Sequence, residues 1–286
     1  MTARTLLILS LLTTGGCLSH RDAAWTAPAQ PFGTVSDQVV VDLIADGERA
    51  WQARADAKQL DEADRAYGAA LRYRPADANI LVRLAHVATR RARLLDGAGG
   101  ASARWDQATR YAERAMAARN PKLADAARAG RPPVAVFSYA EPADAPALVI
   151  YAEALLGWAM SRGTPTVVER RGWISAAAGR ALGFDRALGW AAPDRVLGIL
   201  DCELPEARQN LREALERFEA AVAAAPAYLP TRIAYAEEYA TRVRDEKLYH
   251  RLLQEVLAAD PRALPEATAE NLDAQRLARG LIRERR

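Results

Sequence analysis

The feature that most constrains the fold of this chain is one spacing of small, aromatic and proline residues that occurs twice. The pattern is Ala-x3-aromatic-x2-Ala-x4-Pro, and its copies are Ala214, Phe218, Ala221 and Pro226, and Ala63, Tyr67, Ala70 and Pro75. Between two packed helices, alanine lets the backbones approach, the aromatic ring fills the gap beside it, and proline ends the helix. The spacing is typical of the second helix of a tetratricopeptide repeat, and it predicts helical hairpins near both ends of the chain.

Apolar residues at helical spacing extend this prediction. In the C-terminal part, Tyr235 and Tyr239 suit a first repeat helix, and the run from Leu252 to Leu257 supplies the apolar stripe of its partner. The two motifs lie 151 residues apart, which is not a multiple of the repeat length of about 34 residues. The sequence therefore predicts an all-α fold of tetratricopeptide-like hairpins that form a solenoid or a closed helical array, with an irregular helical insert over residues 120–200.

The insert differs in composition from the segments that flank it. Residues 120–146 are rich in proline and are expected to form a long loop. A strongly apolar helix is expected over Ala147–Met160, and residues 167–182 suggest its partner helix. Because the first of these helices is apolar on more than one face, it belongs in the middle of the structure. We expect residues 37–286 to form a single domain.

The first sixteen residues have the order of a secretory signal. An apolar run, Leu6–Leu12, precedes small residues that stand directly before Cys17, and it is shorter than the about 20 residues that span a bilayer. A cysteine in this position resembles the lipobox of bacterial lipoproteins; the alternative is an ordinary signal beside an incidental cysteine. We expect a signal peptide over residues 1–16, lipidation of Cys17 and a flexible tether over residues 17–36. Leu18 favours an outer-membrane lipoprotein that faces the periplasm.

The residues that usually carry catalysis are not grouped in this sequence. The three histidines, His20, His86 and His250, lie far apart, and none is followed by a second ligand three or four residues later, which speaks against a metal site. Cys202 is expected to be a buried small hydrophobe. The chain has no nucleophile elbow or phosphate loop, and a net charge of +3 is weak support for a nucleic-acid surface. The sequence predicts neither an enzyme nor a cofactor, and no nucleic-acid partner.

Aromatic side chains are the candidate binding residues. The set comprises Tyr151, Trp158, Trp173, Trp190, Tyr235 and Tyr239. Two interpretations stay open: the rings form the core of a helical bundle, or they line a cavity inside the array that binds a lipophilic ligand or a partner segment. Arg195 is the candidate polar residue. It either pairs with Asp194 near a helix start or faces the concave surface.

Several blocks of the sequence resemble the T-component (TatT) family associated with TRAP transporters. The blocks are Ala147 to Trp158, Asp194 to Gly198, Leu204 to Arg208, Ala221 to Leu229, Tyr235 to Glu237, Leu252 to Pro261, Leu264 to Glu266 and Glu270 to Ala278. The similarity extends from about Val40 to Leu281 and is strongest beyond Pro193. A glycine-rich segment that members often carry before the C-terminal hairpin is shortened here to Asp201–Leu204.

The resemblance implies a periplasm-facing lipoprotein whose tetratricopeptide-like fold encloses a channel. Its expected partners are a periplasmic solute-binding protein, which feeds a TRAP permease with organic acids or lipophilic ligands, and the membrane through the lipid anchor. A homo-oligomer also stays open. The alternative function is a repeat scaffold for outer-membrane or cell-envelope assembly, whose concave face takes a peptide.

Overall fold

The structure, a computed structural model of the 286-residue chain, describes residues 21–26, 30–95 and 100–285. No strand occurs among the described residues, which confirms the predicted all-α class. The α-helices are α1 Asp37–Gln52, α2 Ala57–Tyr73, α3 Ala78–Leu94, α4 Ala101–Arg119, α5 Pro121–Arg128, α6 Pro133–Phe137, α7 Ala145–Arg162, α8 Thr164–Phe184, α9 Leu188–Glu203, α10 Leu211–Ala224, α11 Pro230–Ala234, α12 Glu246–Ala258 and α13 Thr268–Glu284. Single turns of 3-10 helix are η1 Pro142–Asp144, η2 Glu206–Arg208 and η4 Pro265–Ala267, and η3 Tyr235–Ala240 is a π-helix.

Both copies of the repeated motif occupy the packing positions that the sequence predicts for them. Their fully buried members are Ala63, Tyr67 and Ala70 on α2, and Ala214, Phe218 and Ala221 on α10. The aromatic ring of each copy packs against a glycine of the preceding long helix. A Cβ atom at Gly47 of α1 would lie 2.6 Å from the Tyr67 ring, and one at Gly198 of α9 would lie 3.2 Å from the Phe218 ring. The motif therefore marks close packing between the two helices of a hairpin. The tetratricopeptide-like repeat character of the array stays a prediction.

Residues 120–146 are more helical than the expected long loop. The side chain of Asn120 accepts a hydrogen bond from the Leu123 N–H at 3.1 Å and so caps α5. Pro121 and Pro133 stand in the first turns of α5 and α6, where a missing N–H costs no helical hydrogen bond. The long-loop expectation was wrong because these prolines begin helices instead of breaking them.

The central helix of the insert is α7, which is buried on nearly all sides, as its composition predicts. Among the described residues, the stretch Pro142–Arg162 is long and apolar enough to cross a membrane by length and composition. Most of that stretch is buried inside the fold, in contact with α3, α4, α8 and α9. Its apolar character is therefore used for packing between helices.

The segment expected as a flexible tether is partly fixed to the fold. Arg21 donates to both carboxylate oxygens of Glu113 on α4, at 2.7 and 2.8 Å, and the Ala24 N–H donates to the same carboxylate at 2.6 Å. Trp25 is 6% exposed and belongs to the main hydrophobic core. For residues 21–26 the expectation of a free tether is therefore wrong. The expected signal peptide and Cys17 lie outside the described residues.

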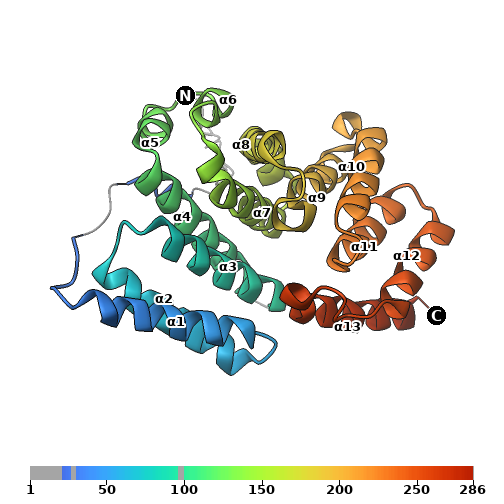
Figure 1. The fold of residues 1–286 in the computed structure, drawn as a ribbon. Coiled ribbons are helices and arrows are strands. Elements are labelled where there is room, and N and C mark those ends of the chain that lie inside the picture. The colour runs from blue at the N-terminus through green and yellow to red at the C-terminus, as the bar shows by residue number, and fades with distance from the viewer. Residues whose placement is uncertain (1–20, 27–29, 96–99, 286) are drawn as a thin grey trace, which may run out of the picture.

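The last helix returns to the first hairpins and closes the array, as Figure 1 shows. Arg54, between α1 and α2, donates to Glu270 of α13 at 2.9 and 2.8 Å. Arg90 of α3 approaches the same carboxylate at 3.3 Å and Asp273 at 3.0 Å. Two hydrophobic cores, one from α1 to α9 and one from α9 to α13, are therefore joined at this edge by buried ion pairs.

Candidate functional site

The residues that best fit a site converge from three helices on one carboxylate. Glu153 of α7 forms an ion pair with Arg93 of α3, and its Oε1 lies 3.5 Å from an Nη atom of Arg195 on α9. Arg195 is 4% exposed, so it faces the interior of the array. Two guanidinium groups thus share a single carboxylate, which leaves an excess of positive charge.

The electrostatics of this group follow from burial and from the charge excess. Burial alone would raise the pKa of Glu153, but the guanidinium groups of Arg93 and Arg195 outweigh it and hold the pKa below its usual value. Burial acts to lower the pKa of Arg93, and the nearby Glu153 carboxylate reverses this and raises it. The pair therefore stays ionised throughout the physiological pH range.

A left-handed backbone turn places Trp190 beside Arg195. Gly189, Trp190 and Ala191 have φ angles of 55°, 58° and 58°, which non-glycine residues rarely adopt. The turn directs the Trp190 carbonyl toward Arg195, which donates to it at 3.1 Å. Such strained turns persist where the surrounding structure holds them, and they cluster at binding sites.

Tyr228 completes an aromatic platform in the same place. Its ring stacks on Trp190 with centroids 4.9 Å apart and an interplanar angle of 18°. The Arg195 guanidinium carbon lies 4.9 Å from the centroid of the Tyr228 ring, and an Nη atom of Arg195 lies 3.4 Å from the Thr231 hydroxyl. Arg195 is therefore held by a ring, a carbonyl and a carboxylate. These residues, together with Arg93, form what we call the central cluster: Arg93, Glu153, Trp190, Arg195 and Tyr228.

Arg195 and its neighbour Asp194 form ion pairs with different residues. Asp194 pairs with Arg217 at 3.0 Å and with Arg186 at 3.4 Å, while Arg195 faces Glu153. Asp194 itself is fully buried. The two neighbours in the sequence thus serve different ion pairs, and Arg195 belongs to the interior of the array.

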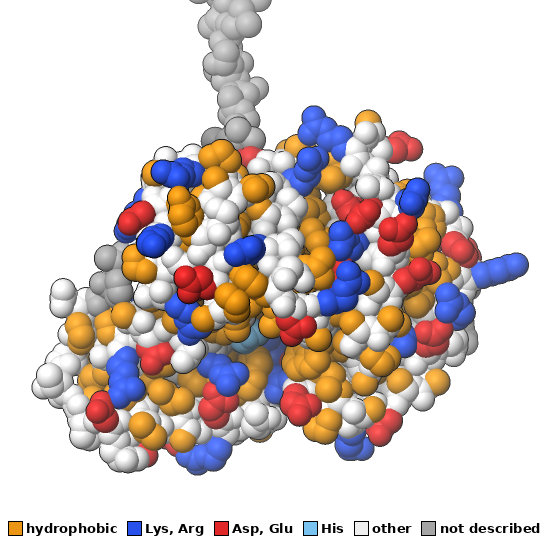
Figure 2. All heavy atoms as spheres, turned by 45° about the horizontal axis from the view of Figure 1, so that its top comes forward, with side chains coloured by type: hydrophobic (Ala, Val, Ile, Leu, Met, Phe, Trp, Pro, Cys, Tyr) orange, Lys and Arg blue, Asp and Glu red, His pale blue; other side chains and the backbone are white. Residues whose placement is uncertain are grey.

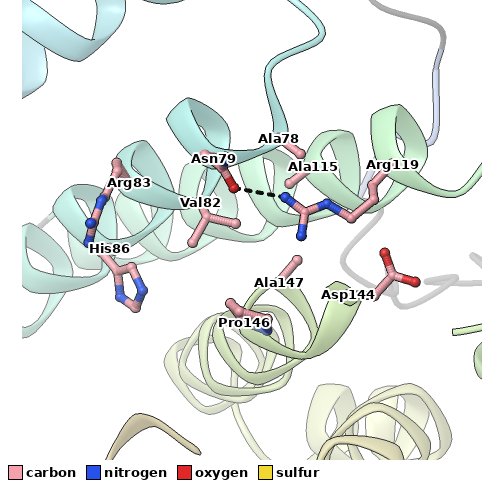
Figure 3. Close-up of a pocket in the computed structure, with 10 residues that line it drawn as sticks. All are labelled: Ala78, Asn79, Val82, Arg83, His86, Ala115, Arg119, Asp144, Pro146 and Ala147. Atoms are coloured by element: carbon pink, nitrogen blue, oxygen red, sulfur yellow. Dashed lines mark hydrogen bonds between the residues drawn. The ribbon is translucent and has the colours of Figure 1, made fainter. Parts of the chain in front are cut away.

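A pocket of about 280 Å³ lies between α3, α4 and the start of α7. Its lining residues, drawn in Figure 3, are Ala78, Asn79, Val82, Arg83, His86, Ala115, Arg119, Asp144, Pro146 and Ala147. At its rim, Arg119 donates to the Asn79 side chain at 2.8 Å. Figure 2 shows a recess in the middle of one face of the molecule, with hydrophobic side chains and a histidine inside it.

His86 connects the pocket to the central cluster. It precedes Arg93 by two helical turns on α3, as Pro146 precedes Glu153 on α7, so pocket and cluster share the same faces of both helices. Burial lowers the pKa of His86 to about 4, although the charge of Glu153 acts in the opposite direction. His86 is therefore neutral at physiological pH, and the charge of the cluster comes from its arginines.

The other predicted aromatic residues do not reach this cluster. Tyr151 and Trp173 pack with Trp25, at centroid distances of 5.7 and 6.3 Å, and with Phe137. Trp158 is 5% exposed, with the Arg170 guanidinium 5.6 Å from its ring. These three predicted residues lie in the packed region around α7 and α8.

Tyr235 and Tyr239 lie in the C-terminal core. The Tyr235 ring stacks on Phe218 with centroids 5.1 Å apart, and the centroid of the Tyr239 ring lies 5.6 Å from that of Tyr235. Burial raises the pKa of Tyr235 to about 12, so its hydroxyl stays protonated. Of the seven predicted binding residues, the structure brings only Trp190 and Arg195 together in the central cluster.

Sequence reasoning missed Arg93, Glu153 and Tyr228. For Glu153 a signal was present, because it is the only charged residue between Ala145 and Met160, in a stretch that is otherwise apolar. A charged side chain in such a helix needs a partner, since an unpaired buried charge is costly. Arg93 carried no comparable signal because the helix around it contains several other arginines.

The rest of the described chain offers little chemistry. No group of three or more histidine, cysteine, aspartate or glutamate side chains that could hold a metal ion occurs among the residues the structure describes. Cys202 is buried, as predicted, and burial raises the pKa of its thiol to about 12. A thiol in that state is a poor nucleophile.

Comparison with known protein families identifies the family of this chain. The model of the family described as TRAP transporter T-component matches residues 67–286, which include every residue of the central cluster. No curated protein matches the chain. The matched region covers more than half of the 286 residues. The chain therefore belongs to the TRAP transporter T-component family, and its role is that of an accessory component associated with a TRAP transporter system of the cell envelope.

Proposed function

We propose that this chain is a non-enzymatic lipoprotein that binds a periplasmic solute-binding protein and contacts the transported ligand at the central cluster. The observation that carries the proposal is the pair of arginines, Arg93 and Arg195, that share the single carboxylate of Glu153 in the interior of a family member. An anionic ligand would balance the remaining positive charge. The ligand class is thus an organic acid.

Arg195 is the residue best placed to bind a ligand carboxylate. Its contacts with Glu153 and Thr231, at 3.5 and 3.4 Å, are long, so neither uses the full hydrogen-bonding capacity of a guanidinium group. Arginine binds carboxylates through two parallel hydrogen bonds when its fork is available. The stacked rings of Trp190 and Tyr228 would take the apolar part of the acid beside it.

The remaining elements of the proposal come from the N-terminal sequence and the family. Cys17, in its lipobox-like position, would carry the lipid that holds the chain on the periplasmic face of the outer membrane. The family membership supports a place beside the solute-binding protein of the same transporter. A homo-oligomer is compatible with this arrangement.

Ligand binding is tested with the purified chain and a panel of short dicarboxylates, aromatic carboxylates and long-chain fatty acids. We expect at least one class to bind by calorimetry and to change the fluorescence of Trp190. Arg195→Gln should weaken that binding roughly tenfold or more, because a charge-assisted hydrogen bond is lost. Arg195→Lys, which keeps the positive charge, should weaken the binding less than Arg195→Gln does. The exposed Arg212→Gln is the control, and melting curves verify that each variant folds.

The partner is tested separately, with the solute-binding subunit encoded with the same transporter. We expect a complex that withstands size-exclusion chromatography. If no acid binds and no solute-binding subunit associates, the proposal is wrong. Binding of extended peptides to the concave face instead would support the repeat scaffold of the cell envelope.

A further inference from the structure

The chain is fixed to the fold directly after the proposed lipidation site. Three residues separate Cys17 from Arg21, whose guanidinium group is held by both carboxylate oxygens of the buried Glu113 and by Asp106 at 2.7 Å. A chain of this length reaches about 14 Å when fully extended. A lipid on Cys17 would therefore enter the membrane close to the surface that holds Arg21.

The outer surface near this anchoring point includes α6. Trp25 of the fixed segment and Phe137 of α6 pack on the same ring of Trp173, at centroid distances of 6.3 and 5.7 Å. Both also pack on Tyr151. While Phe137 at the end of α6 is buried, Val134 in the first turn of α6 is 75% exposed, more than any other large hydrophobic side chain among the described residues.

Basic residues accompany this exposed apolar side chain. From Arg119 to Glu141 the sequence has four basic and two acidic residues. Among the residues the structure describes, Lys122 has no acidic partner, and Arg131 donates to the hydroxyl of Tyr139, which is itself 39% exposed. Anionic phospholipids attract basic side chains that lie within a Debye length of about 10 Å.

We propose that the α5–α6 edge, defined as Lys122, Arg131, Val134 and Tyr139, lies on the anionic phospholipid leaflet that holds the lipid of Cys17. Val134 and Tyr139 contact the boundary between headgroups and acyl chains, and the two basic side chains contact phosphate groups. The inference rests on the lipid anchor of the proposed function and adds a fixed orientation to it. Figure 1 places α5 and α6 at one end of the molecule and α13 at the other, so α13 faces away from the leaflet.

Depth-dependent fluorescence quenching tests this orientation. The full chain is purified with its lipid and reconstituted into vesicles of phosphatidylethanolamine and phosphatidylglycerol that contain nitroxide-labelled lipid. A fluorophore is attached to Val134→Cys or, as the matched control on α13, to Leu277→Cys, whose parent side chain is 46% exposed. Because Cys202 is buried, the parent chain measures the background of labelling. We expect strong quenching at position 134 and little at position 277.

Charge variants and lipid composition separate the outcomes. The double substitution Lys122→Glu and Arg131→Glu should lower the fraction of molecules whose probe at position 134 contacts the membrane. Each lost basic side chain should lower the equilibrium constant for this contact roughly fivefold or more. The same loss is expected in vesicles of phosphatidylcholine alone. Equal quenching at both positions in a membrane-bound protein overturns the orientation and leaves the anchor intact. If the purified parent chain carries no acyl groups on Cys17 and does not float with vesicles, both the anchor and the orientation are wrong.

Discussion

Glu270 of the last helix and Arg54 of the first interhelical loop form a two-point ion pair that closes the helical array. The Nε and Nη2 atoms of Arg54 donate to the two oxygens of Glu270 at 2.9 and 2.8 Å. The side chain of Arg54 is 3% exposed and that of Glu270 is 8% exposed. The residues are 216 positions apart in the sequence. Because the hydrophobic cores on the two sides are separate clusters, this contact couples the ends of the chain.

The closure should depend on the charge of Glu270. Glu270→Gln leaves the buried Arg54 without a carboxylate, while Arg90 keeps Asp273, and we expect a loss of about 3–5 kcal/mol in the free energy of unfolding. Urea denaturation followed by circular dichroism measures it. The control is Glu216→Gln, which removes the exposed pair with Arg212 and should change stability by less than about 0.5 kcal/mol. Equal effects of the two substitutions would contradict a closing role for Glu270.

His86 should make the fold sensitive to mild acid. Its pKa is about 4 in the folded chain, against about 6.5 in the unfolded chain, so the unfolded state binds more protons between these values. The contribution of neutral His86 to the free energy of unfolding is fully present above pH about 6.5 and is lost as the pH falls toward 4. We expect His86→Asn to flatten the dependence of stability on pH by up to about one proton in this window. Unfolding curves at several pH values measure the slope.

The control for this prediction is His250→Asn. His250 lies on α12 with about half of its side chain exposed, so its replacement removes a histidine that is not part of the pocket. An equal change of the slope in both variants would show that the effect is not specific to position 86. A slope that is unchanged in His86→Asn would show that other groups carry the acid sensitivity.

The helices could be predicted from the sequence because their determinants are local. The repeated alanine and aromatic positions are buried as expected, and the apolar composition of α7 placed it correctly in the centre. The prediction of a long loop over residues 120–146 was wrong because of its prolines. Proline in the first turn of a helix is compatible with the helix, whereas proline farther along ends it. Local sequence alone does not distinguish these two uses.

The central cluster and the fixed N-terminal segment could not be predicted, because they depend on contacts between distant residues. Arg21 and Glu113 are 92 positions apart, and each is an ordinary charged residue in its local sequence. Trp190 and Arg195 were identified from their residue types, but whether an aromatic side chain faces a core or a site depends on the helix that packs against it. Tyr151 and Trp173 face the core for that reason.

Glu238 should destabilise the fold at neutral and alkaline pH. Burial raises the pKa of this carboxyl group in the π-helix η3, and the nearby Glu203 raises it further. The folded state therefore keeps a proton that the unfolded state has lost above pH about 4.5, and stability falls as the pH rises from there through the folded pKa. We expect Glu238→Gln to be more stable than the parent chain at pH 8 and similar to it near pH 4, as measured by thermal unfolding. Lower stability at both values would contradict a protonated Glu238.

Among the glycines of the insert, Gly157 of α7, which contacts Trp105 of α4, should tolerate substitution least. A Cβ atom at position 157 would lie 2.6 Å from the indole ring, which is held in the core. We expect Gly157→Ala to cost about 1–3 kcal/mol, because the two helices must move apart. Gly179→Ala on α8 is the matched control, since no atom lies within 4 Å of its Cβ position. Alanine there should stabilise the helix by about 0.5–1 kcal/mol, so the two substitutions should change the urea midpoint in opposite directions. A gain in stability for both would mean that α4 and α7 pack less closely than this contact requires.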